Sequence, residues 1–202
     1  MPQERLRGRP RDEATDLAIL TAACDLLLDD GYERLTMERV ATRAGVGKPT
    51  VYRRWSSKAH LVGDAVHRVY SEAAGRADQG PAHAAGVRRD LADWLQSCAE
   101  VAADRRTAPL VLALVAAAAG SRADAQSLYG ALTRVQHEAV VRRLRAGAAD
   151  GELRPDADFE AVADALIGSV LYQLLTDRTS GSSSRATALL DVVLNGLTED
   201  HR

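Results

Sequence analysis

The chain has 202 residues, 46% of them apolar, and a formal net charge of −2 at pH 7. This apolar fraction excludes an intrinsically disordered chain and supplies a sizeable core, enough for one large domain or for a small domain joined to a larger one. The small net charge by itself does not indicate a nucleic-acid-binding protein, so the distribution of charge along the chain is more informative.

Basic residues are concentrated at the N-terminal end. Residues 1–60 hold 11 Lys and Arg against 9 Asp and Glu, whereas residues 61–202 hold 15 against 19. Residues 1–11, with four Arg and one Glu, are predicted to form a flexible basic arm. Arg7-Gly8-Arg9-Pro10 resembles the core of an AT-hook, in which Gly lets an extended chain enter a narrow minor groove and Arg responds to its negative potential. The alternative is a disordered tail that only aids solubility.

Beyond the arm, nearly every long segment carries apolar residues at helical spacing, and no segment alternates convincingly as a strand would. Gly, Pro and cap residues mark the ends of these segments. The predicted helices cover residues 12–30, 36–44, 48–54, 57–77, 87–103, 108–119, 122–149, 156–177 and 184–198. The apolar stripe of the first helix is predicted to consist of Leu17, Leu20, Cys24, Leu27 and Leu28.

These elements predict an all-α fold of about nine helices. An N-terminal three-helix domain covers residues 12–56, and a connecting helix covers residues 57–78. A C-terminal helical bundle covers residues 79–202. The stretch from Asp78 to Gly86, which contains Gly80 and Pro81, is predicted to be the joint between the two regions.

Residues 36–58 read TMERVATRAGVGKPTVYRRWSSK and meet several requirements of a helix-turn-helix together. Two short helices must cross steeply through a tight turn. Ala41 supplies a small residue at their closest approach, and Gly45 can take the positive φ that the turn needs. The apolar anchors that hold both helices on the core are Val40, Val46 and Val51. The alternative, two packed helices with a solvated basic face, does not account for this coincidence.

The second of these helices is predicted to expose the donors and small contact groups that a recognition helix presents to base edges and phosphates. They are Lys48, Thr50, Tyr52, Arg53 and Arg54, with Lys58 just beyond. Pro49 is compatible with the helix because it falls in the first turn. Val51 and Trp55 are predicted to face the core instead.

The run from Leu35 to Leu61 resembles the DNA-binding motif of the TetR family of repressors, T-x-x-x-x-A-x-x-A-G-V followed by Y-x-x-aromatic-x-x-K-x-x-L. The matching residues are Thr36, Ala41, Ala44, Gly45, Val46, Tyr52, Trp55, Lys58 and Leu61. The family usually has Phe where Trp55 stands. The resemblance implies that the major groove is contacted by Lys48, Pro49, Thr50 and Tyr52. It implies that phosphates are contacted by Thr36, Tyr52, Arg53, Arg54 and Lys58.

For the region after residue 86, the resemblance implies a ligand cavity inside the bundle and a dimer interface built from the last two helices. Large or polar side chains within apolar helical stretches are the candidates for the cavity. They are Trp94, Cys98, Leu112, Val115, Tyr129, His137 and Tyr172. The alternative, ordinary core packing or a place on the surface, is the more common role for each such residue, and no motif identifies a particular ligand.

The two last predicted helices are apolar enough to form half of an isologous four-helix interface. The candidate interface residues are Phe159, Val162, Leu166, Val170, Leu190, Val193, Leu194 and Leu197. The alternative is that these residues close the core of the monomer. Dimerisation itself is expected, because a single recognition helix offers too few contacts for a specific operator.

Other classes of protein find little support. The sequence contains no glycine-rich phosphate loop, no His and Cys pair at metal-ligand spacing and no G-x-S-x-G motif, so we expect no enzyme activity, no cofactor and no metal. Cys24 and Cys98 lie within apolar helical patterns, which favours a reducing compartment. The longest uncharged run, Thr107 to Ser121, has 15 residues, short of the roughly 20 that a membrane-spanning helix needs. We therefore expect a cytoplasmic protein.

The sequence thus predicts a DNA-binding transcriptional regulator that binds a double-stranded, near-palindromic operator as a homodimer and is released from it by an unknown small-molecule effector. The alternative is a ligand-independent, architectural DNA-binding protein. The length of the region after residue 86 favours the regulator, since DNA binding alone does not require so many further residues.

Overall fold

Helices make up most of residues 13–176 and 182–196, the part of the chain that the structure, a computed structural model, describes. This part contains ten α-helices, a 3-10 segment, a π-helical segment and no strand. In chain order the elements are α1 (Glu13–Arg34), α2 (Met37–Arg43), α3 (Lys48–Arg54), α4 (Lys58–Ala74), η1 (Gly75–Gln79), α5 (Val87–Ala103), α6 (Thr107–Gly120), α7 (Arg122–Tyr129), η2 (Gly130–Arg134), α8 (Val135–Ala149), α9 (Phe159–Leu175) and α10 (Ser182–Asn195). The predicted all-α fold is confirmed, with one α-helix more than the nine expected.

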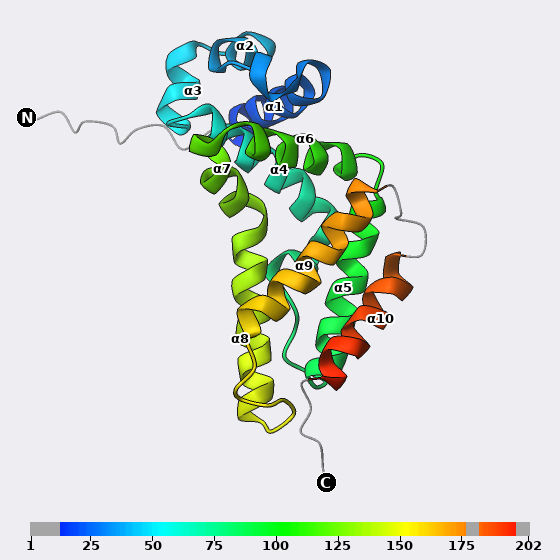
Figure 1. The fold of residues 1–202 in the computed structure, drawn as a ribbon. Coiled ribbons are helices and arrows are strands. Elements are labelled where there is room, and N and C mark those ends of the chain that lie inside the picture. The colour runs from blue at the N-terminus through cyan, green and yellow to red at the C-terminus, as the bar shows by residue number, and fades with distance from the viewer. Residues whose placement is uncertain (1–12, 177–181, 197–202) are drawn as a thin grey trace, which may run out of the picture.

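The small unit formed by α1, α2 and α3 lies at one end of the molecule (Figure 1). Helix α6 crosses beneath it, and α5, α8, α9 and α10 form the bundle at the other end. One apolar core joins α1, α2, α3, α4 and α6, because Leu27, Val51, Val66 and Leu110 belong to the same buried cluster. The helix-turn-helix is therefore not a freely tethered module, since it shares its core with the helices that lead into the bundle.

The buried face of α1 differs from the predicted stripe. Leu17 is 43% exposed and Leu28 is 49% exposed, whereas Ile19 and Leu26 are buried. The helix carries apolar residues on more than one face, so helical spacing alone did not decide which face packs against α4 and α6. Gly31, where the helix was predicted to end, has φ 76° and ψ 168°, and the chain resumes a helical turn after it as far as Arg34.

The single helix predicted over residues 122–149 is interrupted. Helix α7 ends at Tyr129, and five residues, Gly130–Arg134, form the π-helical segment η2 before α8 begins. A π segment carries one more residue per turn than the α-helix and so rotates the side chains that follow it, and such segments are frequent at functional sites. Helical periodicity in the sequence does not reveal an interruption of this kind.

The joint predicted between Asp78 and Gly86 is tied to its surroundings. The Asp78 carboxylate accepts a 2.8 Å hydrogen bond from the Ser71 hydroxyl of α4. Further along, Asp90 at the start of α5 forms a 2.7 Å ion pair with Arg143 of α8, and both side chains are 3% exposed. The same carboxylate accepts the backbone N–H groups of Ala84 and Ala85. This buried pair therefore fixes the joint against α8.

Candidate nucleic-acid interface and ligand cavity

The bend between α2 and α3 follows from a few local interactions. The Thr36 hydroxyl caps α2 by accepting the N–H of Arg39 at 3.2 Å. Gly45 has φ 67°, a left-handed conformation that costs Gly little. The Val46 N–H donates to the Ala41 carbonyl at 3.0 Å, and Ala41 is 1% exposed. A larger side chain than Ala41 would separate the two helices, so the sequence requirements of the turn correspond to observed contacts.

Four residues of α3 share its solvent-facing side. Lys48 and Tyr52 are one helical turn apart, as are Pro49 and Arg53, and all four are exposed. Thr50 between them is half-buried. On the opposite side of α3, Val51 is fully buried, and Trp55 beyond its end is 5% exposed and donates its indole N–H to the Asp64 carboxylate of α4 at 2.9 Å. Val51 and Trp55 thus anchor the helix, as predicted, and Lys48, Tyr52 and Arg53 are turned outward.

Glu38 of α2, which the sequence analysis did not single out, organises this face. Its carboxylate accepts a 3.0 Å hydrogen bond from the Tyr52 hydroxyl, and the Lys48 ammonium lies 4.0 Å from the same oxygen. Hydrogen bonds from its own backbone N–H and from Tyr52 lower the pKa of Glu38, so it is ionised. Lys48 and Tyr52, two of the four predicted groove-facing residues, therefore lie beside an acidic residue in the free protein.

Two of the predicted phosphate contacts have structural partners instead. The Arg54 side chain is 10% exposed and forms an ion pair with Asp16 of α1, which turns its guanidinium towards the protein. The Lys58 ammonium donates to the Tyr32 carbonyl at 3.0 Å and lies 4.0 Å from the centre of the Tyr32 ring. The exposed cations of α3 are therefore Lys48, its first residue, and Arg53. Arg7 and Arg9 of the predicted arm lie outside the described residues.

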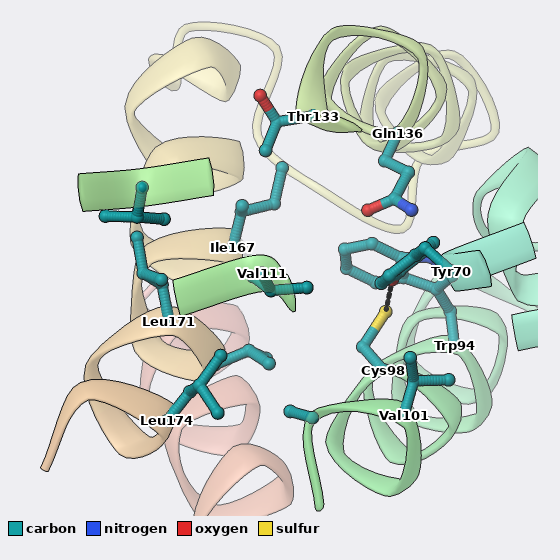
Figure 2. A pocket seen from close by; sticks show the side chains of 13 residues that line it. Tyr70, Trp94, Cys98, Val101, Val111, Thr133, Gln136, Ile167, Leu171 and Leu174 are labelled. Atoms are coloured by element: carbon teal, nitrogen blue, oxygen red, sulfur yellow. Dashed lines mark hydrogen bonds between the residues drawn. The ribbon is translucent and has the colours of Figure 1, made fainter. Parts of the chain in front are cut away.

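A mainly apolar cavity of about 100 Å³ lies between the helices of the bundle (Figure 2). Its lining comes from α4, α5, α6, η2, α8 and α9. The lining residues are Tyr70, Trp94, Cys98, Val101, Ala102, Val111, Val115, Thr133, Gln136, Ile167, Val170, Leu171 and Leu174. Three of the predicted pocket residues, Trp94, Cys98 and Val115, are among them.

Three other predicted pocket residues, Leu112, His137 and Tyr172, do not line this cavity. Leu112 packs behind it, against the apolar cluster that contains Val111. The His137 imidazole lies 3.1 Å from the Asp164 carboxylate and 3.7 Å from that of Glu160, on the outer side of α8. Tyr172 is 58% exposed. The Tyr129 side chain is outside the described set. Sequence reasoning could not separate the inner from the outer side of helices this apolar.

Polar groups are few in the cavity. The Tyr70 hydroxyl donates to the Cys98 sulfur at 3.9 Å. Burial raises the pKa of the Cys98 thiol to about 12, and burial also raises the pKa of Tyr70 above its ordinary value. Both groups are therefore neutral at physiological pH. Gln136, which the sequence analysis missed, is 5% exposed, and its amide nitrogen has no hydrogen-bond partner among the described residues.

Four of the eight predicted interface residues are buried within one chain. Leu166 and Leu190 are fully buried and Leu194 is 1% exposed, because these side chains of α9 and α10 belong to the core of the bundle. Phe159 is 8% exposed in the same core. Val162, Val170 and Val193 are half-buried, and Leu197 is outside the described residues. The largest exposed apolar side chains of the two helices are instead Tyr172, Leu175 and Val192.

A three-helix unit with an outward-facing basic helix, joined through α4 to a larger helical domain that contains an apolar cavity, defines the class of DNA-binding transcriptional regulators with a helix-turn-helix. Residues 19–65 match the family described as "Bacterial regulatory proteins, tetR family". Residues 81–193, more than half of the chain, match the family described as "Tetracyclin repressor-like, C-terminal domain". The chain belongs to the TetR family of transcriptional regulators.

Individual relatives agree with this assignment. The chain is 30% identical over 195 residues to the uncharacterized HTH-type transcriptional regulator YdeS of Bacillus subtilis, covering 94% of this chain and 91% of YdeS. It is similar to the crystal structure of the TetR family transcription regulator SCO0332, with 28% identity and a TM-score of 0.69 over 92% of this chain and 99% of that one. The fold also matches that of Bacillus subtilis FadR in complex with stearoyl-CoA, at 17% identity and a TM-score of 0.68 over 90% of this chain and 98% of that one. No helix among residues 13–176 and 182–196 is long and apolar enough to cross a bilayer.

Proposed function

We propose that the protein is a cytoplasmic, ligand-released repressor that binds a near-palindromic operator as a homodimer. In this proposal residues 1–11 form a basic arm, residues 12–56 bind DNA, residues 57–78 form the connecting helix, and residues 79–202 bind the ligand and the second subunit. The observation that carries the proposal is that one helix, α4, contacts both the cavity and the three-helix unit: Tyr70 near its end lines the cavity, and Lys58 at its start donates to the Tyr32 carbonyl of α1.

The DNA-binding step uses the exposed side of α3. Lys48, Pro49, Thr50 and Tyr52 would face base edges, and Thr36 and Arg53 would contact phosphates, as on other recognition helices. Arg54 and Lys58 would support the site by fixing α3 and α4 to α1, because their charged groups are already bound to protein partners. Lys48 would exchange its Glu38 neighbour for a nucleic-acid acceptor.

Dimerisation would use the exposed sides of α9 and α10. The apolar groups Tyr172, Leu175 and Val192 are accompanied by small exposed residues, Ala161, Ala165, Gly168 and Ala188. Such small residues let two helices approach closely, and a two-fold interface of four helices would result. Two copies related in this way would present two α3 helices to successive major grooves, about 34–36 Å apart.

Release of the DNA would follow from a ligand that prefers one arrangement of α4. The start of α4 is fixed to α1, so a movement of its Tyr70 end would change the orientation of the three-helix unit formed by α1, α2 and α3. A ligand can shift this equilibrium only by its difference in affinity for the two arrangements. Helices α4 and α6 line the cavity through Tyr70 and Val111, and they also pack in the core that contains α1, so a change in the lining would reach the three-helix unit through packed residues.

The test is a selection from random double-stranded oligonucleotides, followed by footprinting and sedimentation of the complex. We expect an inverted repeat bound by two subunits. The variants K48A and Y52A should lose or change sequence preference while keeping the dimer. An absence of any preferred sequence, or normal binding by both variants, would refute the DNA-binding site. A preferred sequence bound equally well whatever small molecule is added would favour the architectural alternative.

A further inference from the structure

We propose that the cavity selects small, uncharged, mainly apolar molecules of about one ring that carry a hydrogen-bond acceptor, such as a carbonyl oxygen, placed against the Gln136 amide nitrogen. This inference rests on the proposed ligand-released function and gives its ligand a chemical class. It concerns what binds in the cavity, and its test reads binding directly, separately from the release of DNA.

The lining sets the charge and polarity of the ligand. All of the described residues that border the cavity are uncharged, and most are aliphatic or aromatic (Figure 2). Trp94, Tyr70 and Cys98 lie on one side, and Ile167, Leu171 and Leu174 of α9 lie opposite. A carboxylate, phosphate or ammonium group placed here would lose its hydration without gaining an opposite charge, which is strongly unfavourable. The bound part of the ligand is therefore neutral.

Gln136 sets the position of the single polar group. Its side chain points from α8 into the cavity beside Tyr70, and it is 5% exposed. Its amide nitrogen lacks a hydrogen-bond partner among the described residues. A buried donor without a partner is uncommon in native structures and calls for an explanation. A ligand oxygen that accepts from this nitrogen provides one, and a bond of this kind is worth roughly tenfold in affinity.

The neighbouring Tyr70 hydroxyl lies close enough to the Gln136 side chain to lower the pKa of Tyr70 against the larger effect of burial, but it does not meet hydrogen-bond geometry with the amide nitrogen. The Tyr70 hydroxyl proton is directed to the Cys98 sulfur. The Cys98 thiol stays protonated because burial raises its pKa to about 12, so it is not a nucleophile towards the ligand. Binding is therefore non-covalent, and Gln136 is the donor available to an acceptor on the ligand.

The volume limits the size of the ligand. A dry cavity of about 150 Å³ holds one benzene molecule in a protein core, and this cavity measures about 100 Å³. A single ring fits after a small outward movement of the lining, whereas a long chain or several rings would require the helices to separate. Thr133 lies on the π segment η2, and Gln136 lies just after it. The lining can therefore move at a point where the helix is already irregular.

Three probe molecules with one ring and the same number of non-hydrogen atoms separate these features. Acetophenone carries a carbonyl acceptor. Cumene has a methyl group in place of the carbonyl oxygen, and benzoate has a charged carboxylate in place of the acetyl group. Binding is measured by titration of the ¹⁵N-labelled full chain. Trp94 borders the cavity and Trp55 lies in the helix-turn-helix, so the two indole N–H signals give a reporter and an internal control.

We expect acetophenone to shift the Trp94 indole and the Gln136 side-chain amide while leaving the Trp55 indole in place. Its dissociation constant should be roughly tenfold lower than that of cumene, and benzoate should not bind. In Q136L the two neutral probes should bind alike, with cumene bound at least as well as by the wild type. Q173L is the matched control, because Gln173 is a buried glutamine of α9 outside this cavity and donates to the Ser169 carbonyl at 3.2 Å.

Several outcomes would overturn the inference. They are binding of benzoate at Trp94, equal affinity of the wild type for acetophenone and cumene, binding of neither neutral probe, or an acetophenone preference that survives in Q136L. The wild-type comparison of probes stands even if Q136L does not fold. If acetophenone binds as described without weakening operator binding, the ligand class stands and the proposed release mechanism fails.

Discussion

The Tyr32 hydroxyl at the end of α1 donates a 2.7 Å hydrogen bond to the Asp124 carboxylate of α7, which is 92 positions away in the chain. Burial and this hydrogen bond raise the pKa of Tyr32, so the hydroxyl keeps its proton. The same residue receives the Lys58 ammonium on its carbonyl oxygen. Tyr32 therefore joins the three-helix unit of α1, α2 and α3 to α4 and to α7, which continues into η2 and α8.

Removing this hydroxyl tests how strongly the two parts are joined. We expect Y32F to lower the free energy of unfolding by about 1–2 kcal/mol, because the variant leaves a partly buried carboxylate without one of its donors. Urea denaturation measures the change. Y52F is the matched control, since it also removes a hydroxyl that donates to a carboxylate, but at an exposed site beside Glu38. Equal urea midpoints for Y32F and wild type would show that the contact does not stabilise the fold.

The buried pair between Arg143 and Asp90 should be sensitive to the loss of one partner. R143M leaves the Asp90 carboxylate buried without its counter-ion, and we expect a loss of about 3–5 kcal/mol in the free energy of unfolding. R88M removes an exposed arginine from its Asp191 partner and should cost much less. The double variant D90L/R143M should recover only part of the loss, because it also removes the acceptor of the Ala84 and Ala85 N–H groups. A single R143M variant as stable as R88M would contradict this account.

The stability conferred by Asp90 should depend on pH. Burial opposes ionisation of this carboxyl, but hydrogen bonds from Arg143, Ala85 and Ala84 outweigh it and lower the pKa of Asp90. The pKa of an Asp side chain in an unfolded chain is about 3.9. The stabilisation is therefore complete above the unfolded pKa and is lost as pH falls through the folded one. The difference in unfolding free energy between wild type and D90N should stay constant above about pH 5 and shrink as pH falls below about 4. A difference that stays constant would disprove the assignment.

Gly80 should tolerate a side chain much less well than Gly151. A Cβ atom at Gly80 would lie 2.2 Å from the Cβ of Ala139 on α8, and the residue has φ 89°. Gly151 has a similar φ of 77° with nothing within 4 Å of its Cβ position. G151A should cost about 1–2 kcal/mol for the left-handed conformation alone, and G80A should cost more because it also forces η1 away from α8. Thermal unfolding of the two variants measures the difference, and equal costs would mean that the contact yields without strain.

Glu38 should weaken DNA binding in the wild-type protein. Its ionised carboxylate lies beside Lys48 and Tyr52 on the face proposed to meet DNA, where it repels phosphates and shields the Lys48 charge. We expect E38Q to bind double-stranded DNA severalfold more tightly at low salt, with the gain falling as salt is added. E72Q on α4, next to Arg68, is the control with the same change of charge. Weaker binding by E38Q would mean instead that Glu38 positions Tyr52 for its contact.

The helix-turn-helix could be predicted in detail because its requirements are local. A Thr that caps α2, an Ala at the crossing and a Gly at φ 67° act within a few residues of one another, so their order in the sequence carries the information. The same holds for the anchors Val51 and Trp55, whose spacing along α3 places them opposite Lys48 and Tyr52.

The second half of the chain was predicted less well. Leu166, Leu190 and Leu194 were expected at an interface and lie in the core of one chain. An apolar residue in a helix contributes the same periodicity whether it meets its own chain or a second copy. Likewise, His137 and Gln136 are adjacent in sequence, but one faces the carboxylates of α9 and the other the cavity.

The sequence by itself determined most of the helices, the bend near Gly45 and the outward direction of Lys48 and Arg53 on α3, because backbone geometry and capping depend on neighbouring residues. Only the tertiary structure decided which arginine is free and which is bound, since Arg54 meets Asp16 from a different helix. It also decided which side of α8 encloses a cavity, because the π segment before Val135 changes the phase of the helix. Contacts between distant segments depend on how helices pack in space, and spacing along the chain does not encode that directly.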